Sequence, residues 1–407
     1  MKHASKSIAH RFTATQLLLA ASTVVLVTTA CGGNNDDYPA LNEIDSTKMQ
    51  ATVATMAAQM LVPGAVVLVR TPKDDFSYNY GATTYKGSTL PTADMHMRIG
   101  SVTKTWTGTV ILQQVQEGLL KLSDPIGKYI AGVPKGDQIT IEMLLMMRSG
   151  LLNYSTSLEF NQALDDSPTR VWAANELLAL VLGKQQQSFD PGTSYEYSNT
   201  NTILLGLLAE KLEDGKPLAT IVQDRIFKRL GLKNTYLPAI TDNSLPQPFS
   251  HGYQYGTNVQ TMAALPPELQ AAARAGTFLP TDETNDNPSW GWSAGSGIST
   301  ANDLAIFARA LVGGGLLNEQ MQAARIASVR EGVPIQPGLG YGWNLAKFGP
   351  LYGHTGEVPG FNTFMGYDPV NKVTVIVWVN LGPNLNARAA GTDIARELIG
   401  QIYAPPV

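Results

Sequence analysis

Residues 362–380 read NTFMGYDPVNKVTVIVWVN, with two apolar runs, 362–367 and 372–380, on either side of the turn sequence Asp-Pro-Val-Asn. Runs of this length that are rich in β-branched residues and bounded by turn residues predict two neighbouring β-strands. Two more strands are predicted near the other end of the chain, at 65–70 and 76–85. Because strands lie near both ends and helical patterns lie between them, we predict one antiparallel sheet built from both chain ends.

Apolar residues at helical spacing fill much of the rest of the chain. The predicted helices are 41–61, 101–117, 140–149, 172–182, 200–213, 218–230, 299–312 and about 386–402. Residues 233–289 are polar and rich in Pro, Asn and Asp, so we expect long loops there, of the kind that often rim a site. The expected fold class is α/β (α+β), with helices flanking the sheet. We assign 41–104 and 290–407 to the sheet domain and 105–289 to a mainly helical inserted domain.

The first thirty residues have the composition of a secretory signal peptide. Basic residues precede a mostly apolar run, Leu17–Ala30, which is too short to span a bilayer. The run leads into Cys31, the only cysteine, and this stretch resembles the lipobox of bacterial lipoproteins. The resemblance implies a cleaved signal peptide at 1–30, a lipidated Cys31 and a tether at 31–40. The protein would then be secreted across the cytoplasmic membrane and lipid-anchored in the bacterial cell envelope. A plain secretory signal with a leftover thiol is the alternative.

Charge and cysteine content exclude several classes of function. The 407 residues carry 29 Lys and Arg against 33 Asp and Glu; without residues 1–30 the balance is 26 against 33, a net charge of −7. An anionic surface argues against nucleic acid as a partner, because phosphate binding needs clustered Lys and Arg. One cysteine permits no internal disulfide, and His96, His251 and His354 show no metal-ligand spacing. We therefore expect no metal ion and no cofactor.

A candidate nucleophile lies in the run Ile99-Gly100-Ser101-Val102-Thr103-Lys104. Residues three apart share a helix face, so Ser101 and Lys104 can touch. A serine hydroxyl becomes an effective nucleophile when a base takes its proton, and a lysine does so once burial or a nearby cation lowers its pKa. The helix N-terminus adds backbone N–H groups where an oxyanion develops. Alone the signal is weak, because Ser-x-x-Lys occurs by chance about once in a chain this long.

Two more motifs follow in the chain, Tyr-x-Asn at 197–199 and His-Thr-Gly at 354–356. With them the sequence resembles the serine β-lactamase and penicillin-binding family, whose signatures are Ser-x-x-Lys, Tyr-x-Asn and Lys/His-Thr-Gly in this order. Tyr197 follows Ser101 by 96 residues and His354 follows Tyr197 by 157, which is similar to the class C β-lactamases and their DD-peptidase relatives. The likeness runs from about residue 55 to the end. The motif forms look most like the Streptomyces-type D-Ala-D-Ala carboxypeptidases, which implies a β-lactamase/transpeptidase-like fold.

The resemblance implies a role for each matching residue. Ser101 attacks a carbonyl and becomes acylated, while Lys104 and Tyr197 share the proton transfers; which of the two is the base stays open. Tyr197 is expected to protonate the leaving group, and the backbone N–H groups of Ser101 and Glu357 are expected to form the oxyanion hole. The other implied substrate-binding residues are Asn199, which would bond the acyl-side amide, Trp290 in the pocket lining, and His354, Thr355 and Gly356.

One departure bears on the substrate. The carboxypeptidases carry an Arg shortly before His-Thr-Gly that holds the terminal carboxylate, whereas residues 341–347 read YGWNLAK and offer only Lys347. We expect a small peptide, amide or ester substrate and D-Ala-D-Ala carboxypeptidase, D-amino-acid peptidase or amidase activity. An esterase or a class C-like β-lactamase, with a β-lactam as ligand, is the alternative. A non-catalytic cell-envelope binding protein is an alternative of another class, against which the three intact motifs weigh.

A second serine motif competes with Ser101. Residues 291–295 read GWSAG, which matches the Gly-x-Ser-x-Gly elbow of α/β-hydrolases around Ser293. That motif requires an apolar strand before it, but the turn sequence Asn-Asp-Asn-Pro precedes it here. We therefore expect Ser293 to be a packing residue.

Overall fold

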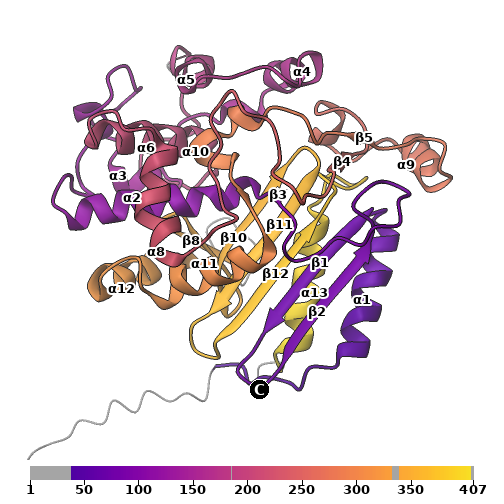
Figure 1. The fold of residues 1–407 in the computed structure, drawn as a ribbon. Helices are drawn as coiled ribbons and strands as arrows, with labels where there is room; N and C mark the ends of the chain where they lie inside the picture. The colour runs from indigo at the N-terminus through magenta and orange to yellow at the C-terminus, as the bar shows by residue number, and fades with distance from the viewer. Residues whose placement is uncertain (1–37, 185, 332–338, 405–407) are drawn as a thin grey trace, which may run out of the picture. The chain divides into compact units, whose positions relative to one another are not determined.

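An eight-stranded antiparallel sheet joins the two ends of the chain, which confirms the predicted fold class (Figure 1). Its order is β2-β1-β12-β11-β10-β9-β8-β7, so the first strand, β1, pairs directly with the last one, β12, and β2 pairs with β1 at the edge. The strands span Gly64–Arg70 (β1), Asp75–Gly81 (β2), Arg330–Glu331 (β7), Leu339–Gly342 (β8), Leu345–Phe348 (β9), Leu351–Val358 (β10), Phe361–Asp368 (β11) and Val373–Val379 (β12).

This computed structural model describes residues 38–184, 186–331 and 339–404. The sheet and all helices named below belong to one compact unit that begins at Pro39. The predicted signal peptide and Cys31 lie outside the described residues, and the division into a sheet domain and an inserted domain stays a prediction. Among the described residues, no helix is long and apolar enough to cross a membrane.

Strand β12 is the centre of the core because its side chains are buried on both faces of the sheet. Val375 and Val377 pack with the helices α1 (Ser46–Gln59) and α13 (Ala390–Ile402). Ile376 and Trp378 point to the opposite face, which α11 (Ala301–Gly313) covers. Burial on both sides explains why this strand reads as a continuous apolar run rather than an alternating one.

Most predicted helices form within a few residues of the expected positions, but four helices of the described residues were not predicted: α4, α9, α10 and α12. Helix α9 lies inside the 233–289 segment that was expected to be loops, so that expectation is wrong for these eight residues. The remaining helices are α2 (Thr103–Gln116), α3 (Ile141–Leu145), α4 (Leu158–Asp166), α5 (Ala174–Leu182), α6 (Asn199–Leu212), α7 (Leu218–Val222), α8 (Lys228–Leu230), α9 (Pro267–Arg274), α10 (Trp292–Gly295) and α12 (Glu319–Ala327).

Two short strand pairs lie outside the main sheet. Strand β3 (Met97–Arg98) pairs with β6 (Ile298–Ser299) directly before the Ser101 motif, and β4 (Tyr253–Gln254) pairs with β5 (Thr281–Asp282). The β3–β6 pair therefore ties the segment before Ser101 to residues 298 and 299, about 200 residues later in the chain.

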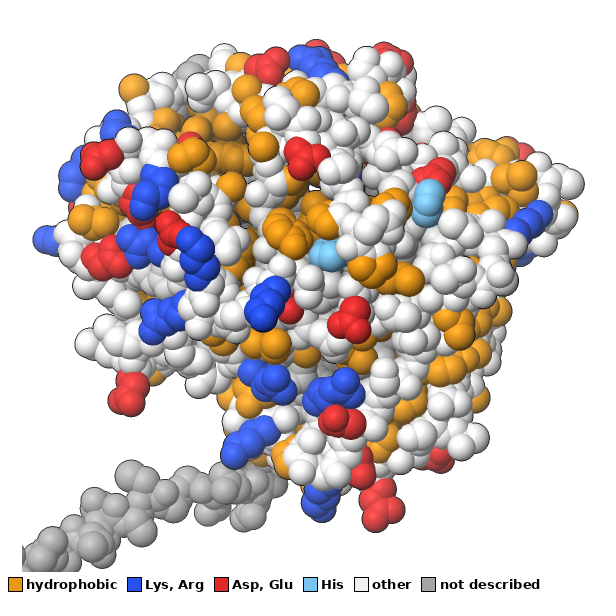
Figure 2. Space-filling model, viewed as in Figure 1, with side chains coloured by type: hydrophobic (Ala, Val, Ile, Leu, Met, Phe, Trp, Pro, Cys, Tyr) orange, Lys and Arg blue, Asp and Glu red, His pale blue; other side chains and the backbone are white. Residues whose placement is uncertain are grey.

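Charged side chains of both signs are interspersed over the face shown in Figure 2 rather than gathered into one basic patch. Several form local ion pairs, such as Arg225 with Glu117 and Glu213. The pair with Glu213 is partly buried and the pair with Glu117 is exposed. Exposed pairs commonly add less than about 1 kcal/mol each, so the buried sheet and helices hold the fold together.

Candidate active site

Ser101 sits in a tight 3-10 turn, Gly100–Val102, that leads directly into α2. The predicted helix 101–117 therefore begins as this turn and becomes α-helical at Thr103. Gly100 has φ +52°, a left-handed conformation that favours glycine, and its carbonyl oxygen accepts a hydrogen bond from Thr103 Oγ1 at 2.7 Å. The turn places Ser101 half-buried at the N-terminal end of a helix whose sides are almost entirely covered by protein.

Lys104 lies one turn after Ser101, with its side chain fully buried. Its Nζ is 3.0 Å from Ser101 Oγ and donates a hydrogen bond to the carbonyl oxygen of Ala294 at 2.7 Å. Burial without a carboxylate partner lowers the pKa of Lys104 well below its ordinary value. A neutral amine at this distance can accept the hydroxyl proton of Ser101.

Tyr197 lies beside both Ser101 and Lys104, two residues before the start of α6. Lys104 Nζ lies 4.9 Å from the centre of its ring. Burial raises the pKa of the Tyr197 hydroxyl, and the nearby Ser101 hydroxyl offsets part of that rise. No hydrogen bond of regular geometry reaches the Tyr197 hydroxyl from the described residues. The phenol therefore stays protonated and its proton is free for transfer.

The His-Thr-Gly motif lies within β10, whose backbone packs against the turn that carries Ser101. The approach is close: a Cβ on Gly100 would lie 2.5 Å from the Glu357 nitrogen, and a Cβ on Gly356 would lie 3.1 Å from the Ser101 nitrogen. Glycine at both positions makes this contact sterically allowed. The backbone nitrogens of Ser101 and Glu357 thus come together, as an oxyanion hole requires.

His354 is buried beside Tyr341 rather than facing the substrate side. Its Nε2 lies 3.2 Å from the Tyr341 hydroxyl and its Nδ1 lies 2.6 Å from the Thr355 carbonyl oxygen. Burial, and then the proximity of Lys104, lower the pKa of His354 to about 3. The imidazole is therefore neutral at ordinary pH and supplies no positive charge to a substrate.

Arg325 and Asn344 complete this side of the site, although the sequence analysis did not single them out. The fully buried guanidinium donates to the carbonyl oxygens of Trp343 and Asn344 and to the Thr109 hydroxyl. Asn344, at φ +45°, donates from Nδ2 to the carbonyl oxygen of Lys104 at 3.1 Å. We call the buried set behind Ser101 the rear wall; it consists of Lys104, Arg325, Tyr341, Asn344 and His354.

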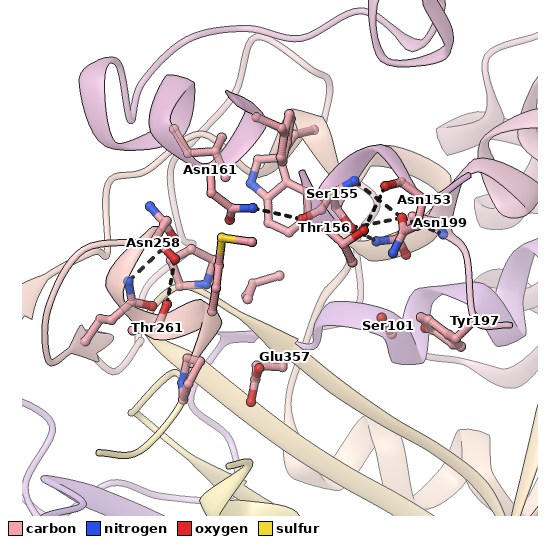
Figure 3. A pocket seen from close by; sticks show the side chains of 18 residues that line it. Ser101, Asn153, Ser155, Thr156, Asn161, Tyr197, Asn199, Asn258, Thr261 and Glu357 are labelled. Atoms are coloured by element: carbon pink, nitrogen blue, oxygen red, sulfur yellow. Dashed lines mark hydrogen bonds between the residues drawn. The ribbon is translucent and has the colours of Figure 1, made fainter. Parts of the chain in front are cut away.

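A cavity of about 410 Å³ opens in front of Ser101, and we call it the front pocket (Figure 3). Asn199 is held there by two hydrogen bonds: its Nδ2 donates to Ser155 Oγ at 2.8 Å, and its backbone N–H donates to Asn153 Oδ1 at 3.1 Å. The lining residues are Ser101, Asn153, Ser155, Thr156, Phe160, Asn161, Leu164, Tyr197, Asn199, Gln254, Asn258, Thr261, Met262, Trp290, Glu357, Val358, Pro359 and Pro383.

The structure thus gathers the predicted residues around Ser101 but divides them between two sides. Tyr197, Asn199, Trp290 and Glu357 line the front pocket with Ser101. The predicted residues that do not line it are Lys104, His354, Thr355 and Gly356. Tyr197, like Ser101, belongs to both sides, since its ring lies near Lys104 and it also lines the pocket.

Glu357 is the only Asp, Glu, Lys, Arg or His among the described residues that line the front pocket. Lys347, which the sequence offered in place of the missing Arg, forms an ion pair with Glu331 on β7 and does not line the pocket. His251 pairs with Asp282 at 2.7 Å, and His96 lies 3.1 Å from the Pro248 carbonyl oxygen. In the described part of the chain, no group of three or more His, Cys, Asp or Glu is arranged to hold a metal ion.

Ser293 packs between helices, in agreement with the sequence prediction. It is fully buried in α10, and its Oγ donates to the Thr202 carbonyl oxygen at 2.9 Å. A Cβ on Gly206 would lie 2.6 Å from the Ser293 side chain, so α10 and α6 are in close contact. The same short helix presents the Ala294 carbonyl that Lys104 bonds.

Comparison with known proteins shows the relationship of this chain directly. The family model described as Beta-lactamase matches residues 49–398. Penicillin-binding protein 4* of Bacillus subtilis is 26% identical over 340 residues, which cover 81% of this chain and 70% of that protein. Penicillin-binding protein 4 of Amycolatopsis lactamdurans is 25% identical over 388 residues, which cover 89% of this chain and 93% of that protein.

Among solved structures, the D-stereospecific amidohydrolase from Streptomyces sp. has a TM-score of 0.73 and 28% identity, covering 87% of this chain and 98% of that chain. The D-amino acid amidase from Ochrobactrum anthropi SV3, in its complex with L-phenylalanine, has a TM-score of 0.72 and 25% identity with the same coverage.

Proposed function

The chain belongs to the β-lactamase family and is a serine hydrolase, and from that premise we propose that it hydrolyses amides of D-amino acids through an acyl-enzyme on Ser101. The similarity to a D-stereospecific amidohydrolase and to a D-amino acid amidase supports this choice of substrate. The observation that carries it is the charge of the front pocket, which holds Glu357 and no cationic side chain among its described lining residues.

This charge separates an amidase from a carboxypeptidase. A carboxypeptidase substrate ends in a free carboxylate, which needs a cation to offset its desolvation. Lys347 is paired with Glu331, and His354 is buried and neutral, so neither provides that cation. The leaving group of a primary amide is ammonia and carries no carboxylate. We therefore favour the amidase over the D-Ala-D-Ala carboxypeptidase.

The proposed acylation uses the short distances around Ser101. The neutral amine of Lys104 accepts the hydroxyl proton as Oγ attacks the amide carbon, and the backbone N–H groups of Ser101 and Glu357 bind the oxyanion. Tyr197 then gives its proton to the leaving nitrogen, the C–N bond breaks, and the proton held by Lys104 restores the phenol. This assigns the base to Lys104, because burial keeps Lys104 neutral and Tyr197 protonated.

Deacylation completes the cycle with one water molecule. The water loses a proton to the neutral amine of Lys104 and attacks the acyl carbon. The ester bond to Ser101 then breaks, and Ser101 Oγ regains its proton from the Lys104 ammonium group. The products are the D-amino acid and free Ser101. Asn199 is placed to hold the acyl side of the substrate. Its backbone nitrogen and its side-chain Nδ2 are both held by hydrogen bonds to residues that line the pocket, Asn153 and Ser155.

The test is a hydrolysis panel with the full-length chain. It compares D- and L-phenylalaninamide, a D-Ala-D-Ala peptide, short p-nitrophenyl esters and nitrocefin. We expect the D-amide to have the highest kcat/KM of the non-activated substrates. A higher kcat/KM for the D-Ala-D-Ala peptide, or rapid turnover of nitrocefin, would replace this proposal with the carboxypeptidase or the β-lactamase.

The nucleophile is tested separately by intact mass. A fluorophosphonate is expected to add once to the wild type and not to Ser101→Ala. If both proteins stay unlabelled and none of the substrates is turned over, the chain is a binding protein on this scaffold.

We also propose that the protein is anchored in the bacterial cell envelope through a lipid on Cys31. The support is the basic start, the short apolar run and the small residues before Cys31. Expression with labelled palmitate should label the wild type, and Cys31→Ser should remove the label and release the protein from the membrane fraction. A labelled Cys31→Ser protein would contradict the proposal.

A further inference from the structure

The side chain of Glu357 is exposed to the front pocket, where no described side chain neutralises it. Its one hydrogen bond among the described residues is a long one, 3.4 Å, from Asn362 Nδ2. The walls of the pocket displace part of the water around the carboxyl, and this desolvation raises its pKa to about 7. Figure 3 shows the side chain extending from β10 into the space in front of Ser101. The carboxylate therefore has no counter-ion among the described side chains, and a positively charged group of a ligand could pair with it.

The position of Glu357 along β10 defines which part of a ligand reaches it. Its backbone nitrogen lies against the Gly100–Ser101 turn, where the attacked carbonyl must sit. The side chain of the same residue therefore starts next to that carbonyl. A group carried by the carbon atom beside the carbonyl comes within its reach, whereas the leaving group lies on the Tyr197 side.

The lining of the pocket supplies a second requirement for the ligand. Phe160, Leu164, Met262 and Trp290 form an apolar part of it, and the ring of Phe160 packs edge-on against Trp290 at 5.9 Å. The Met262 side chain is 46% exposed, so it offers apolar surface for a ligand to cover. An aromatic or large aliphatic side chain buries more of this surface than a methyl group does.

We propose that the Glu357 carboxylate binds the free α-ammonium group of the substrate, so that the enzyme selects unblocked amino-acid amides with large apolar side chains over N-acylated ones. The inference rests on the proposed function, because it assumes that Ser101 attacks the carbonyl of the same amino acid. It adds a binding role for the side chain of Glu357, whereas the oxyanion hole uses only its backbone.

The experiment compares D-phenylalaninamide with N-acetyl-D-phenylalaninamide on the wild type and on Glu357→Gln. We expect the wild type to prefer the unblocked amide by at least about tenfold in kcat/KM, because a charged hydrogen bond in a pocket is worth about 1.5–3 kcal/mol. In Glu357→Gln this ratio should fall about tenfold or more, mainly through KM. Glu331→Gln, which removes a carboxylate away from the pocket, is the matched control and should keep the ratio.

Two results would overturn the inference. The first is an unchanged ratio in Glu357→Gln. The second is an equal loss of kcat on both amides with accumulation of acyl-enzyme by mass, which would make Glu357 a base in deacylation instead.

A binding assay separates this inference from the proposed function. Each amide is tested for protection of Ser101 against fluorophosphonate labelling, which needs no turnover. If neither amide is hydrolysed but only the unblocked one protects, and this protection needs Glu357, the inference stands while the amidase proposal fails. If the amides are hydrolysed and both protect equally, the amidase proposal stands and the inference fails.

Discussion

The two sides of Ser101 differ in how fully their polar side chains are hydrogen-bonded within the protein. In the rear wall each polar side chain has a protein partner: Arg325 bonds through all three nitrogens, and Tyr341 bonds both His354 and Asn344. In the front pocket, Glu357 has one long hydrogen bond and no counter-ion among the described residues. The polar groups of the rear wall are thus already bonded to protein, whereas the pocket has polar groups, above all the Glu357 carboxylate, that a ligand could bind.

This difference indicates a division of tasks. In the mechanism that we propose, burial in the rear wall keeps Lys104 and His354 neutral and so allows Ser101 to react. In the same proposal, the open pocket selects the substrate. If this is correct, changes in the rear wall should act on kcat or on stability, and changes in the pocket should act on substrate preference. Each prediction below tests one side against the other.

The largest effect is expected from Lys104→Met, which keeps the volume of the side chain but removes the amine. Without a base, kcat should fall by about 10²- to 10⁴-fold, the usual contribution of general base catalysis. Steady-state kinetics on the best substrate measures it. Lys347→Met removes a lysine outside the pocket and should stay within about twofold of the wild type. Retention of more than about a tenth of the activity by Lys104→Met would assign the base to Tyr197.

Arg325→Met should reduce the free energy of unfolding by about 3 kcal/mol. The substitution leaves two buried carbonyl oxygens and the Thr109 hydroxyl without their donor, at about 1–3 kcal/mol for each unsatisfied group before the structure relaxes. Urea unfolding measures the change. Arg330→Met, at an exposed position on β7, is the control and should stay within about 0.5 kcal/mol. A loss below about 1 kcal/mol would show that the rear wall tolerates an unsatisfied group.

Ser293→Ala tests whether a buried serine outside the rear wall contributes to the reaction. The hydroxyl bonds only the Thr202 carbonyl oxygen and does not touch Ser101, so we expect a loss of about 1 kcal/mol of stability and nearly full kcat. Thermal unfolding and steady-state kinetics measure the two quantities. Loss of fluorophosphonate labelling in Ser293→Ala would instead identify Ser293 as the nucleophile.

The smallest effect is a pH dependence of substrate preference. The pKa of Glu357 is about 7, so the carboxylate is protonated as the pH falls below 7 and its attraction for an ammonium group is lost. Between pH 7.5 and pH 6, the ratio of kcat/KM for D-phenylalaninamide to that for its N-acetyl form should fall about threefold, because the α-amino group, with a pKa of about 7.7–8.0, gains part of its charge while the carboxylate loses its own. Taking the ratio cancels the titration of Lys104, which acts on both substrates. A ratio that rises as the pH falls would contradict the prediction.

The sheet and the reactive pair were predictable because local sequence determines both. The run VTVIVWV of β12 reads as a strand whatever surrounds it, and pairing with β1 at the other end follows from the order of elements. Ser101 and Lys104 lie three residues apart on one helical turn, so their contact follows from helix geometry alone. The motif around Tyr197 required a family resemblance, since nothing local indicates that it lies beside Ser101.

The remaining parts depend on tertiary contacts that the sequence pattern does not show. Arg325 is the one fully buried residue of helix α12, and its apolar residues Met321, Ala324 and Ile326 are only partly buried against the core. The apolar face that the sequence offers for this helix is therefore weak. Strands β8 and β9 have four residues each, and Gly340 and Gly342 interrupt β8. The unpaired carboxylate of Glu357 results from the absence of neighbouring cations in space, which no motif records.

The contact between Gly100 and Gly356 has a consequence for redesign. The turn that carries Ser101 and β10 approach so closely that neither Gly100 nor Gly356 has room for a Cβ, so the spacing of the reactive atoms depends on glycine at both positions. The side chain of the next residue on the strand, Glu357, lines the pocket instead, so we expect that it can be exchanged without moving Ser101. Exchanging it for a cationic residue is therefore a route to an enzyme with the same chemistry and a preference for acidic substrates. Because Gly100 and Gly356 position Ser101 while the side chain of residue 357 lines the pocket, we expect that substrate selectivity can be changed without changing the reactive geometry.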